Sequence, residues 1–444
     1  MVDSITLVEN KTVQLDLPEG VSLYDLSRYL DEVWQSRMLF DKDSMQEGQS
    51  TQQPFLTFTQ DLKSGRPVIK AGKYVGFIQF EGITIQIIPK LFGPEQADKG
   101  FTHLIWWLSY CQRVRFPFTD LMSDVNSIKD FPEALISYFA RFAHQQVSSL
   151  PYHQYEETTE TLPFLRGCLN SQQYVNNSLS RGNWHQLVCD YEPFTFNNRL
   201  NQIIKYVARK LTHICRFPDT HRNLEKLIFI LDEVDDMSAT IQDCDSLHLN
   251  QFYQEYESCL AMCRFFLADS YLTRADTDQV HLCFLVPMDY VYEDFIAGVI
   301  EQHFTAYFKK ITTQATKWLT EEKVFQIRND ILLTYPSESR VIADTKYKVR
   351  EYINRKAGIS QTDLYQVVSY GLRQNTQQIL LLYPTPYGKQ PTPIQELTVT
   401  SKLMDNRRIH IQAVDLTITG ETKQDMLNNL LIELRSAFAF STNQ

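Results

Sequence analysis

The sequence is poor in the features that mark fibrous, disordered or membrane proteins. It has only 15 glycines in 444 residues and a charged fraction of 22%, which is typical of an ordinary globular chain. No apolar run approaches the roughly 20 residues that a membrane helix requires, and no basic segment followed by an apolar core opens the chain. We therefore expect a cytoplasmic protein with no membrane contact, and its length favours two or three separate cores.

Signals for zinc, nucleotide and polyanion binding are also sparse. The eight cysteines form no CxxC pair, and none stands at zinc-ligand spacing from histidines, so a zinc site is not indicated. A Walker A phosphate-binding loop is missing, which argues against nucleotide hydrolysis by this chain itself. The formal net charge of −10 argues against a surface that coats nucleic acid broadly, but it leaves room for a local basic groove.

Hydrophobic patterning divides the chain into three regions. Residues 1–100 are predicted to be β-rich with one helix, residues 101–285 to be mainly helical, and residues 286–444 to form a domain of their own. In the first region two β-rich runs flank Glu81 and Gly82, which indicates a hairpin with a tight turn.

Two predictions concern the middle region. Its polar residues 154–161 are predicted to be a linker between the preceding helices and residues 163–167. Residues 200–211 and 247–267 are predicted to be helical because apolar residues recur at helical spacing.

The last region has the alternation of an α/β domain. Its predicted order is a helix, two strands joined by a turn, a second helix and two further strands, at residues 292–308, 331–333, 341–344, 363–372, 379–383 and 409–416. This order predicts an α/β domain around a small mixed sheet, which makes the whole chain an α+β multidomain protein.

The first two of these strands carry two acids and a lysine. Because side chains two apart on a strand point the same way, Asp344 and Lys346 are expected to project from one face, and Asp330 enters from the neighbouring strand. Two converging carboxylates form a hard oxygen site suited to Mg²⁺, while a lysine ammonium can orient a water or stabilise developing charge. The pattern is equally compatible with a solvated ion pair at the end of a strand.

The flanking helices offer further members of such a site. Gln366 and Tyr370 are four apart and share a helix face, so the glutamine can hold a water or a phosphate and the tyrosine can pack beside it. Glu293 lies on the preceding helix, where it can support a metal. An ordinary helix surface, and a first-turn acid favoured by the helix dipole, explain the same residues.

Four blocks of sequence follow one another in an order that covers most of the chain. They are residues 74–90, ending Ile87-Ile88-Pro89-Lys90; residues 165–201, with Leu165-Arg166-Gly167 and Asp190-Tyr191-Glu192-Pro193; residues 288–295, with Tyr292-Glu293-Asp294-Phe295; and residues 342–370, with Asp344-Thr345-Lys346. In this order they resemble McrC, the nuclease subunit of McrBC-type modification-dependent restriction systems.

The resemblance implies a PD-(D/E)xK endonuclease domain that cuts modified double-stranded DNA with Mg²⁺, in defence against foreign DNA. The residues to which it assigns roles are Asp330, Asp344, Lys346 and Gln366 for catalysis, Asp330, Asp344 and Glu293 for the metal, and Lys348, Arg350 and Tyr370 for weaker DNA contacts.

A partner is implied as well. McrC-like proteins act with a hexameric AAA+ GTPase motor of the McrB type, whose GTP hydrolysis they stimulate, so GTP is expected to bind the partner and not this chain. The β-rich N-terminal region is the expected docking part, with Glu81 and Gly82 as one contact; a purely structural hairpin explains these two residues equally well.

One departure and two alternatives qualify this reading. Asn329 precedes Asp330 where the family often has proline, which affects strand entry but removes no ligand. Thr345 is expected to face away from Asp344 and Lys346, so a threonine should be tolerated between them. The alternatives are a non-cleaving regulator that only activates the NTPase partner and a nuclease that cuts without a partner.

Overall fold

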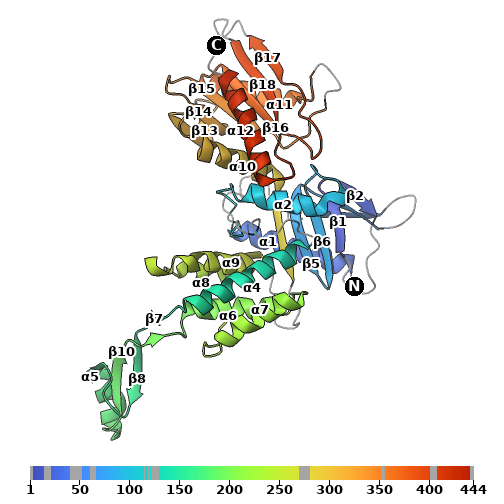
Figure 1. The fold of residues 1–444 in the computed structure, drawn as a ribbon. Coiled ribbons are helices and arrows are strands. Elements are labelled where there is room, and N and C mark those ends of the chain that lie inside the picture. The colour runs from blue at the N-terminus through green and yellow to red at the C-terminus, as the bar shows by residue number, and fades with distance from the viewer. Residues whose placement is uncertain are drawn as a thin grey trace. The chain divides into compact units, whose positions relative to one another are not determined.

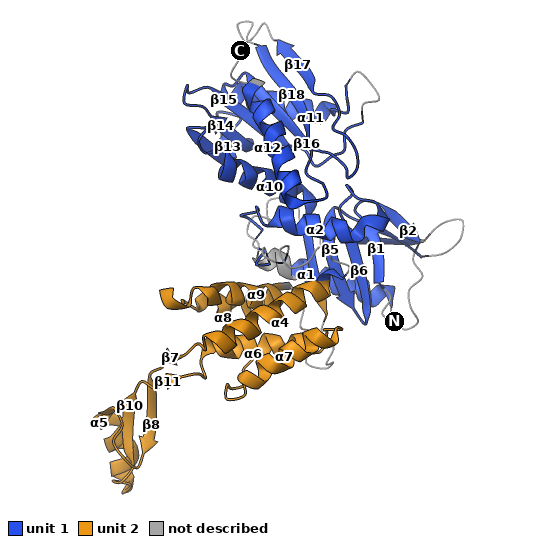
Figure 2. Ribbon diagram, in the orientation of Figure 1, with its two compact units in different colours: residues 1–131, 283–444 blue, residues 132–282 orange. Residues whose placement is uncertain are grey.

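The computed structural model describes residues 4–14, 22–40, 53–60, 67–114, 116–118, 121, 130–269, 281–351, 356–400 and 408–440. The chain divides into two compact units, unit 1 of residues 1–131 with 283–444 and unit 2 of residues 132–282 (Figure 2). This division differs from the three regions expected from the sequence, because the N-terminal and C-terminal parts of the chain pack together as unit 1.

Two small sheets form the N-terminal part of unit 1. The first has the order β1-β6-β5-β12, from β1 (Ser4–Val8), β5 (Tyr74–Phe80), β6 (Ile83–Ile88) and β12 (Leu282–Pro287). The second has the order β2-β4-β3, from β2 (Thr12–Gln14), β3 (Leu56–Gln60) and β4 (Pro67–Ala71). The same part of the chain contains α1 (Leu23–Phe40), the short turn η2 (Pro94–Gln96) and α2 (Ala97–Leu108) (Figure 1).

The predicted hairpin is confirmed. Strands β5 and β6 are antiparallel with Phe80 opposite Ile83, so Glu81 and Gly82 form a two-residue turn. Both turn residues have positive φ, 44° and 82°, as required where a short turn follows the twist of two paired strands.

Strand β12 lies where the chain passes from unit 2 back into unit 1, at residues 282–283, close to the boundary predicted at residue 285. We had not predicted this strand, which lies beside β5 in the first sheet. Gly76 has a φ of 141°, and a Cβ at this position would lie 2.0 Å from the carbonyl oxygen of Phe284. Glycine is therefore required where β5 meets β12, and the chain returns to the N-terminal sheet before it enters its last region.

A six-stranded mixed sheet forms the C-terminal part of unit 1, as expected. Its order is β13-β14-β15-β16-β18-β17, from β13 (Lys310–Trp318), β14 (Gln326–Thr334), β15 (Arg340–Thr345), β16 (Gln378–Pro384), β17 (Gln395–Thr400) and β18 (Arg408–Leu416). The pairs β15–β16 and β16–β18 are parallel and the other three are antiparallel. Strands β13 and β17 were not predicted.

Three helices accompany this sheet: α10 (Met288–His303), α11 (Gln361–Gln374) and α12 (Lys423–Phe440). Helix α11 lies on one face, where Val367 and Tyr370 pack in a core with Ile342 and Leu381, and α12 lies on the other face (Figure 1). Each buried aliphatic side chain of this kind contributes roughly 1.5–3 kcal/mol. The core therefore fixes the end of β15 against α11.

Unit 2 is a helical body with a small β-structured part. Its helices are α4 (Phe131–Ser149), α6 (Arg199–Thr212), α7 (Pro218–Ile230), α8 (Ile241–Ser246) and α9 (Glu255–Asp269), with the short turn η5 (Gln251–Tyr253) before α9. Helix α6 starts as predicted because the side chain of Asn198 accepts a hydrogen bond from the Asn201 N–H. The helix predicted over residues 247–267 instead begins at Glu255.

Residues 154–195 form what we call the β module. It contains β7 (Gln154–Tyr155), β8 (Thr158–Leu162), β9 (Cys168–Leu169), β10 (Leu187–Tyr191), β11 (Phe194–Thr195), the one-turn α5 (Ser171–Gln173) and the turns η3 (Tyr174–Ser178) and η4 (Leu179–Arg181). The prediction of a linker over residues 154–161 is therefore wrong, because β8 pairs with β10 in a three-stranded sheet.

Candidate active site

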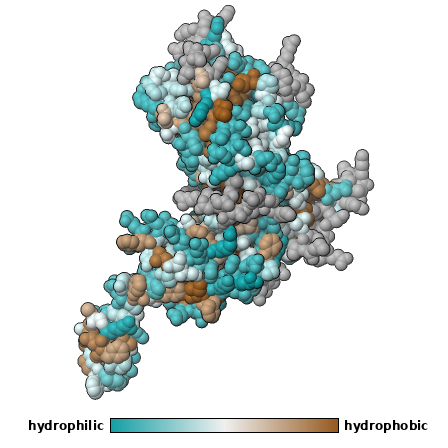
Figure 3. All heavy atoms as spheres, viewed as in Figure 1, coloured by the Kyte–Doolittle hydropathy of each residue, from teal (hydrophilic) through white to brown (hydrophobic). Residues whose placement is uncertain are grey.

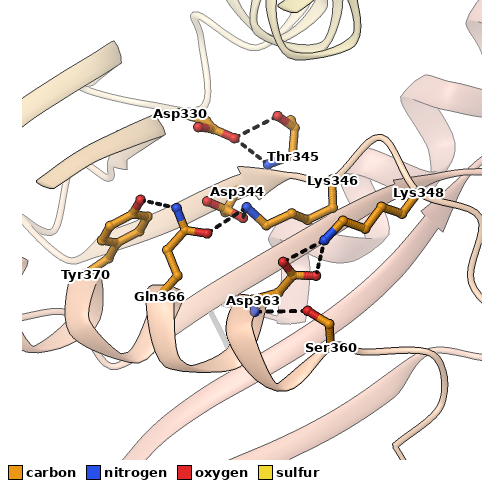
Figure 4. Close-up of polar contacts among 9 residues, drawn as sticks. All are labelled: Asp330, Asp344, Thr345, Lys346, Lys348, Ser360, Asp363, Gln366 and Tyr370. Atoms are coloured by element: carbon orange, nitrogen blue, oxygen red, sulfur yellow. Dashed lines mark hydrogen bonds and ion pairs between the residues drawn. The ribbon is translucent and has the colours of Figure 1, made fainter. Parts of the chain in front are cut away.

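The two predicted strands place Asp330 and Asp344 where their ladder ends. The last pair of the antiparallel ladder between β14 and β15 is Ile331 with Ala343, so Asp330, which precedes Ile331, and Asp344, which follows Ala343, lie just beyond it. Backbone groups beyond a ladder are not held by the partner strand, which leaves room for side chains between the strand ends. Figure 4 shows both carboxylates at this edge of the sheet.

Asp344 and Lys346 form a close ion pair. Oδ2 of Asp344 lies 2.7 Å from Nζ of Lys346, and the two side chains are only 1% and 13% exposed. The predicted projection from a common face is thus confirmed, and the pair is buried, unlike the solvated pair of the alternative reading. Oδ1 of Asp344 is buried without a hydrogen-bond partner among the described residues.

Helix α11 holds the lysine from the other side. Nζ of Lys346 donates to Oε1 of Gln366 at 3.1 Å, and Nε2 of Gln366 lies 2.6 Å from the hydroxyl oxygen of Tyr370, to which it donates (Figure 4). Gln366 and Tyr370 share a helix face, as the sequence spacing predicted. The tyrosine fixes the glutamine amide, which in turn fixes the ammonium of Lys346.

Burial and neighbouring charge raise the pKa of the Asp344 carboxyl to about 7. Burial is the larger cause, the charge of Asp330 adds to it, and the ammonium of Lys346 opposes both. Burial alone would lower the pKa of Lys346, but the nearby carboxylates of Asp344, Asp330 and Asp363 outweigh it, and the pKa is raised. The lysine therefore stays protonated while the acid is poised near neutrality.

Asp330 is held by Thr345. Its Oδ2 accepts hydrogen bonds of 2.7 Å from both the backbone N–H and the hydroxyl of Thr345 (Figure 4). Thr345 faces away from the Asp344–Lys346 pair, as expected, and it positions the second carboxylate. Strand alternation predicted its direction and did not reveal this partner.

Glu293 approaches the same site from α10. It lies 3.3 Å from the guanidinium of Arg113, which follows α2 in the N-terminal part of unit 1. Burial, and then the charge of Asp330, raise the pKa of Glu293 to about 7 against the opposing effect of Arg113. Glu293 is therefore close enough to Asp330 to interact with it, while its own ion pair is with Arg113.

The three residues expected to contact DNA lie in different surroundings. Nζ of Lys348 pairs with both oxygens of Asp363 at 2.9 and 3.0 Å and remains half exposed. Arg350 is buried and pairs with Asp415, so its expected role at a DNA surface is contradicted by its position in the protein interior. Tyr370 is buried as well, with its hydroxyl turned to Gln366.

The comparisons with known proteins bear on the whole chain. The family model described as "McrBC 5-methylcytosine restriction system component" matches residues 69–384, well over half of the sequence. The chain belongs to this McrBC family. No protein of curated function matches it by sequence.

Two solved structures are similar to this McrBC-family chain. One is the half-complex from a tetradecameric assembly of Thermococcus gammatolerans McrB AAA+ hexamers with bound McrC, at 16% identity and a TM-score of 0.73, covering 98% of this chain and 100% of that chain. The other is the McrBC complex of the same organism, at 17% identity and a TM-score of 0.51, covering 68% and 88%. At such identities the likeness shows the fold.

The acids of this McrBC-family chain suit a magnesium ion with few protein ligands. Within the described ranges, no three Asp, Glu, His or Cys side chains converge as a complete metal centre. Both carboxylate oxygens of Asp344 are buried and accept no hydrogen bond among those residues, although Oδ2 is ion-paired with Lys346, and the carboxyl interacts with the charge of Asp330. Mg²⁺ is commonly held by one or two carboxylates with water and phosphate oxygens, so this pair fits it.

Proposed function

We propose that this chain is the Mg²⁺-dependent endonuclease subunit of a McrBC-like restriction system, with a PD-(D/E)xK domain that cuts modified double-stranded DNA. The buried Asp344–Lys346 pair beside Asp330 carries the proposal, because two carboxylates and an ammonium at one sheet edge suit phosphodiester hydrolysis. As part of a restriction system the cleavage would act against foreign DNA.

Each residue has a defined task in this proposal. Asp330 and Asp344 would hold Mg²⁺, which when bound lowers the pKa of a water and offsets phosphate charge. Lys346 would place its ammonium beside the scissile phosphate, where it stabilises developing negative charge. Gln366 holds that ammonium in place at 3.1 Å. Glu293 would act as a supporting carboxylate next to Asp330.

Lys348 is the remaining basic residue of the three expected at DNA. Its side chain is half exposed and follows Lys346 by two positions, so we propose that it contacts a backbone phosphate near the cut. Its pairing with Asp363, in the first turn of α11, holds it at the edge of the site.

We further propose that an AAA+ GTPase motor of the McrB type is the partner and that the chain stimulates its hydrolysis. The similar half-complex contains McrB AAA+ hexamers with bound McrC. The turn at Glu81 and Gly82 is exposed at the tip of its hairpin and remains a candidate contact. This turn presents one charged residue and one glycine to a partner, and no apolar side chain.

The β module is a second candidate surface for the motor. Its sheet buries Val188 and Cys189, whereas its large apolar side chains are exposed, among them Trp184 at 69%, Phe164 at 58% and Leu165 at 59%. Apolar residues gather on this module in Figure 3. Exposed apolar surface of this kind marks an interaction site in soluble proteins.

Substitution of Asp344 tests the nuclease proposal. We expect Asp344→Ala, assayed with a McrB-type partner, GTP, Mg²⁺ and modified DNA, to cut at least about 10³-fold more slowly while partner binding and GTPase stimulation persist. Lys310→Ala is the matched control, because this residue is exposed on β13 of the same sheet.

The other readings predict different results. A wild-type complex that stimulates GTP hydrolysis but never cuts would refute the nuclease proposal and favour the non-cleaving regulator. Cutting by the isolated chain at the rate of the complex would favour a nuclease that needs no partner.

A further inference from the structure

Lys90 joins the N-terminal sheet to the segment that carries Lys346. It closes the turn after β6, and its Nζ donates to the carbonyl oxygen of Tyr347 at 2.8 Å. The same ammonium lies 4.1 Å from the centre of the Tyr347 ring. Because Tyr347 follows Lys346 directly, the N-terminal sheet touches the chain next to the candidate active site.

Glu9 fixes the ammonium of Lys90. This carboxylate is fully buried at the end of β1, with Oε1 3.7 Å from Nζ of Lys90. It also accepts hydrogen bonds from the backbone N–H of Lys90 and from the side chain of Asn10, at 3.4 and 3.0 Å. A buried charge is costly unless it is paired, so Lys90 is tied to its position, whereas a surface lysine would be free to move.

Residues 346–348 form a tight turn that depends on the Tyr347 peptide. The N–H of Lys346 donates to the carbonyl of Leu382 at 2.8 Å, and the N–H of Lys348 donates to the carbonyl of Lys346 at 2.7 Å. The second bond closes a three-residue turn. The turn sends Lys346 toward Asp344 and Lys348 toward Asp363, with the Tyr347 carbonyl held between them by Lys90.

We propose that Lys90 is a positioning residue for the nuclease site: by holding the Tyr347 carbonyl it fixes the turn that presents Lys346 to Asp344. The effect on cleavage rests on the proposed function, whereas the position of Lys346 is a property of the fold. A shift of β1 or β6 would move Lys346 through the hydrogen bond between Lys90 and the Tyr347 carbonyl. The N-terminal sheet is therefore a part of the site.

The test compares Lys90→Met with Lys99→Met. Lys99 also links the N-terminal and C-terminal parts of unit 1, but it does so through Tyr387 and Glu421 and not through the 346–348 turn. Two quantities are measured in each variant of the full chain: the cleavage rate of the reconstituted complex, and the rate at which an acetylating reagent modifies Lys346, followed by mass spectrometry.

We expect Lys90→Met to lower kcat about tenfold or more with little change in KM for DNA, because a small misplacement of a reacting group is costly. Acetylation of Lys346 should rise several-fold, since its ammonium leaves Asp344. Lys99→Met should change neither quantity. Lys90→Arg keeps a cationic donor above the Tyr347 ring, so its cleavage rate and its rate of Lys346 acetylation should be close to those of the wild type. If Lys90→Met melts near the assay temperature, Lys90→Gln takes its place.

The two readouts separate this inference from the proposed function. Equal behaviour of Lys90→Met and Lys99→Met in both assays would overturn the positioning role. If the wild-type complex never cuts but Lys346 becomes acetylated selectively in Lys90→Met, the positioning role stands and the nuclease proposal falls. Normal cutting and labelling in Lys90→Met would leave the nuclease and remove the role of Lys90.

Discussion

The edge of the six-stranded sheet buries charged side chains, whereas the β module exposes apolar ones to solvent. At the sheet edge, Asp344 and Lys346 are charged and buried. On the β module, Trp184 and Phe164 are apolar and exposed. Both arrangements cost free energy in the isolated chain, and a fold retains such costs where a ligand or a partner relieves them.

The difference between the two regions indicates what relieves each cost. In the proposed function a cation would relieve the buried carboxylates and a substrate phosphate would relieve the ammonium of Lys346, which is a requirement for chemistry. Exposed aromatic side chains are relieved by another apolar surface, which is a requirement for assembly. We therefore expect changes at the sheet edge to alter pH response and cleavage, and changes in the β module to alter partner affinity alone.

The largest effect expected in this comparison concerns pH and the buried acids of unit 1. Burial raises the pKa of Glu9 to about 7, and the ammonium of Lys90 opposes the shift. Burial likewise raises the pKa of Glu293 and of Asp344 to about 7. The folded protein thus binds these protons more tightly than the unfolded chain. Their stabilising effect is complete below about pH 4.5 for the two glutamates and below about pH 3.8 for Asp344, and it is lost as the pH rises through about 7.

Glu9→Gln isolates one of these acids without touching the proposed metal ligands. The free energy of unfolding of the wild type should fall between about pH 4.5 and 7. In Glu9→Gln we expect this fall to be smaller by on the order of 2–3 kcal/mol, because a glutamine binds no proton. Unfolding is followed by calorimetry across this pH range, and Glu160→Gln on the exposed face of β8 is the control. A pH profile unchanged by Glu9→Gln would show that the buried carboxylate titrates normally.

The next largest effect concerns the exposed aromatic side chains of the β module. We expect the double change Phe164→Ser and Trp184→Ser to weaken binding to a McrB-type motor roughly 30-fold or more, since interface aromatic side chains of this kind contribute about 1 kcal/mol or more each. Titration calorimetry measures the affinity, and cleavage at saturating partner should be retained. The control is Phe229→Ser, another highly exposed aromatic of unit 2, which lies on α7.

The hairpin turn is tested beside the module. Glu81→Lys changes the charge at the tip of β5 and β6 and leaves the apolar surface intact. If this change weakens motor binding and the β-module double change behaves like Phe229→Ser, the docking surface lies at the hairpin and the comparison drawn above is wrong.

The parts of the fold that could be predicted depend on short-range regularities. The hairpin around Glu81 and Gly82 follows from two residues that favour a tight turn between β-rich runs. The common direction of Asp344 and Lys346 follows from the period of a strand, and that of Gln366 and Tyr370 from the period of a helix. Each regularity acts within a few residues, so one sequence is enough to detect it.

The parts that were missed depend on long-range contacts or on strands without an apolar face. The link from Lys90 to Tyr347 spans 257 residues, and no local pattern marks it. Strands β7 and β8 are mostly exposed, with Thr and Glu where a half-buried strand would alternate with apolar residues, so residues 154–161 resembled a linker. Arg350 was misplaced because a basic residue near an active site gives no sign of its burial.

The smallest effect expected concerns Thr345, whose contact with Asp330 the sequence did not indicate. Its hydroxyl and its N–H both donate to Oδ2 of Asp330 at 2.7 Å. Thr345→Val keeps the shape and the N–H but removes the hydroxyl, so Asp330 loses one of its two hydrogen bonds. A hydrogen bond to a charged group contributes about 1.5–3 kcal/mol in full, and the remaining N–H retains part of the positioning. We expect cleavage to slow about five- to tenfold, with a higher Mg²⁺ concentration needed for half-maximal rate.

Thr345→Ser supplies the comparison for this last change. Serine keeps the hydroxyl and loses only a methyl group, so it should cut at nearly the wild-type rate if the hydrogen bond matters. If valine and serine slow cleavage equally, the methyl packing of Thr345 is what the site needs, and Asp330 is positioned by its strand. Normal cleavage by Thr345→Val would show that the hydroxyl of Thr345 is not needed to position Asp330, and would confine the sensitive chemistry of the sheet edge to the buried Asp344–Lys346 pair.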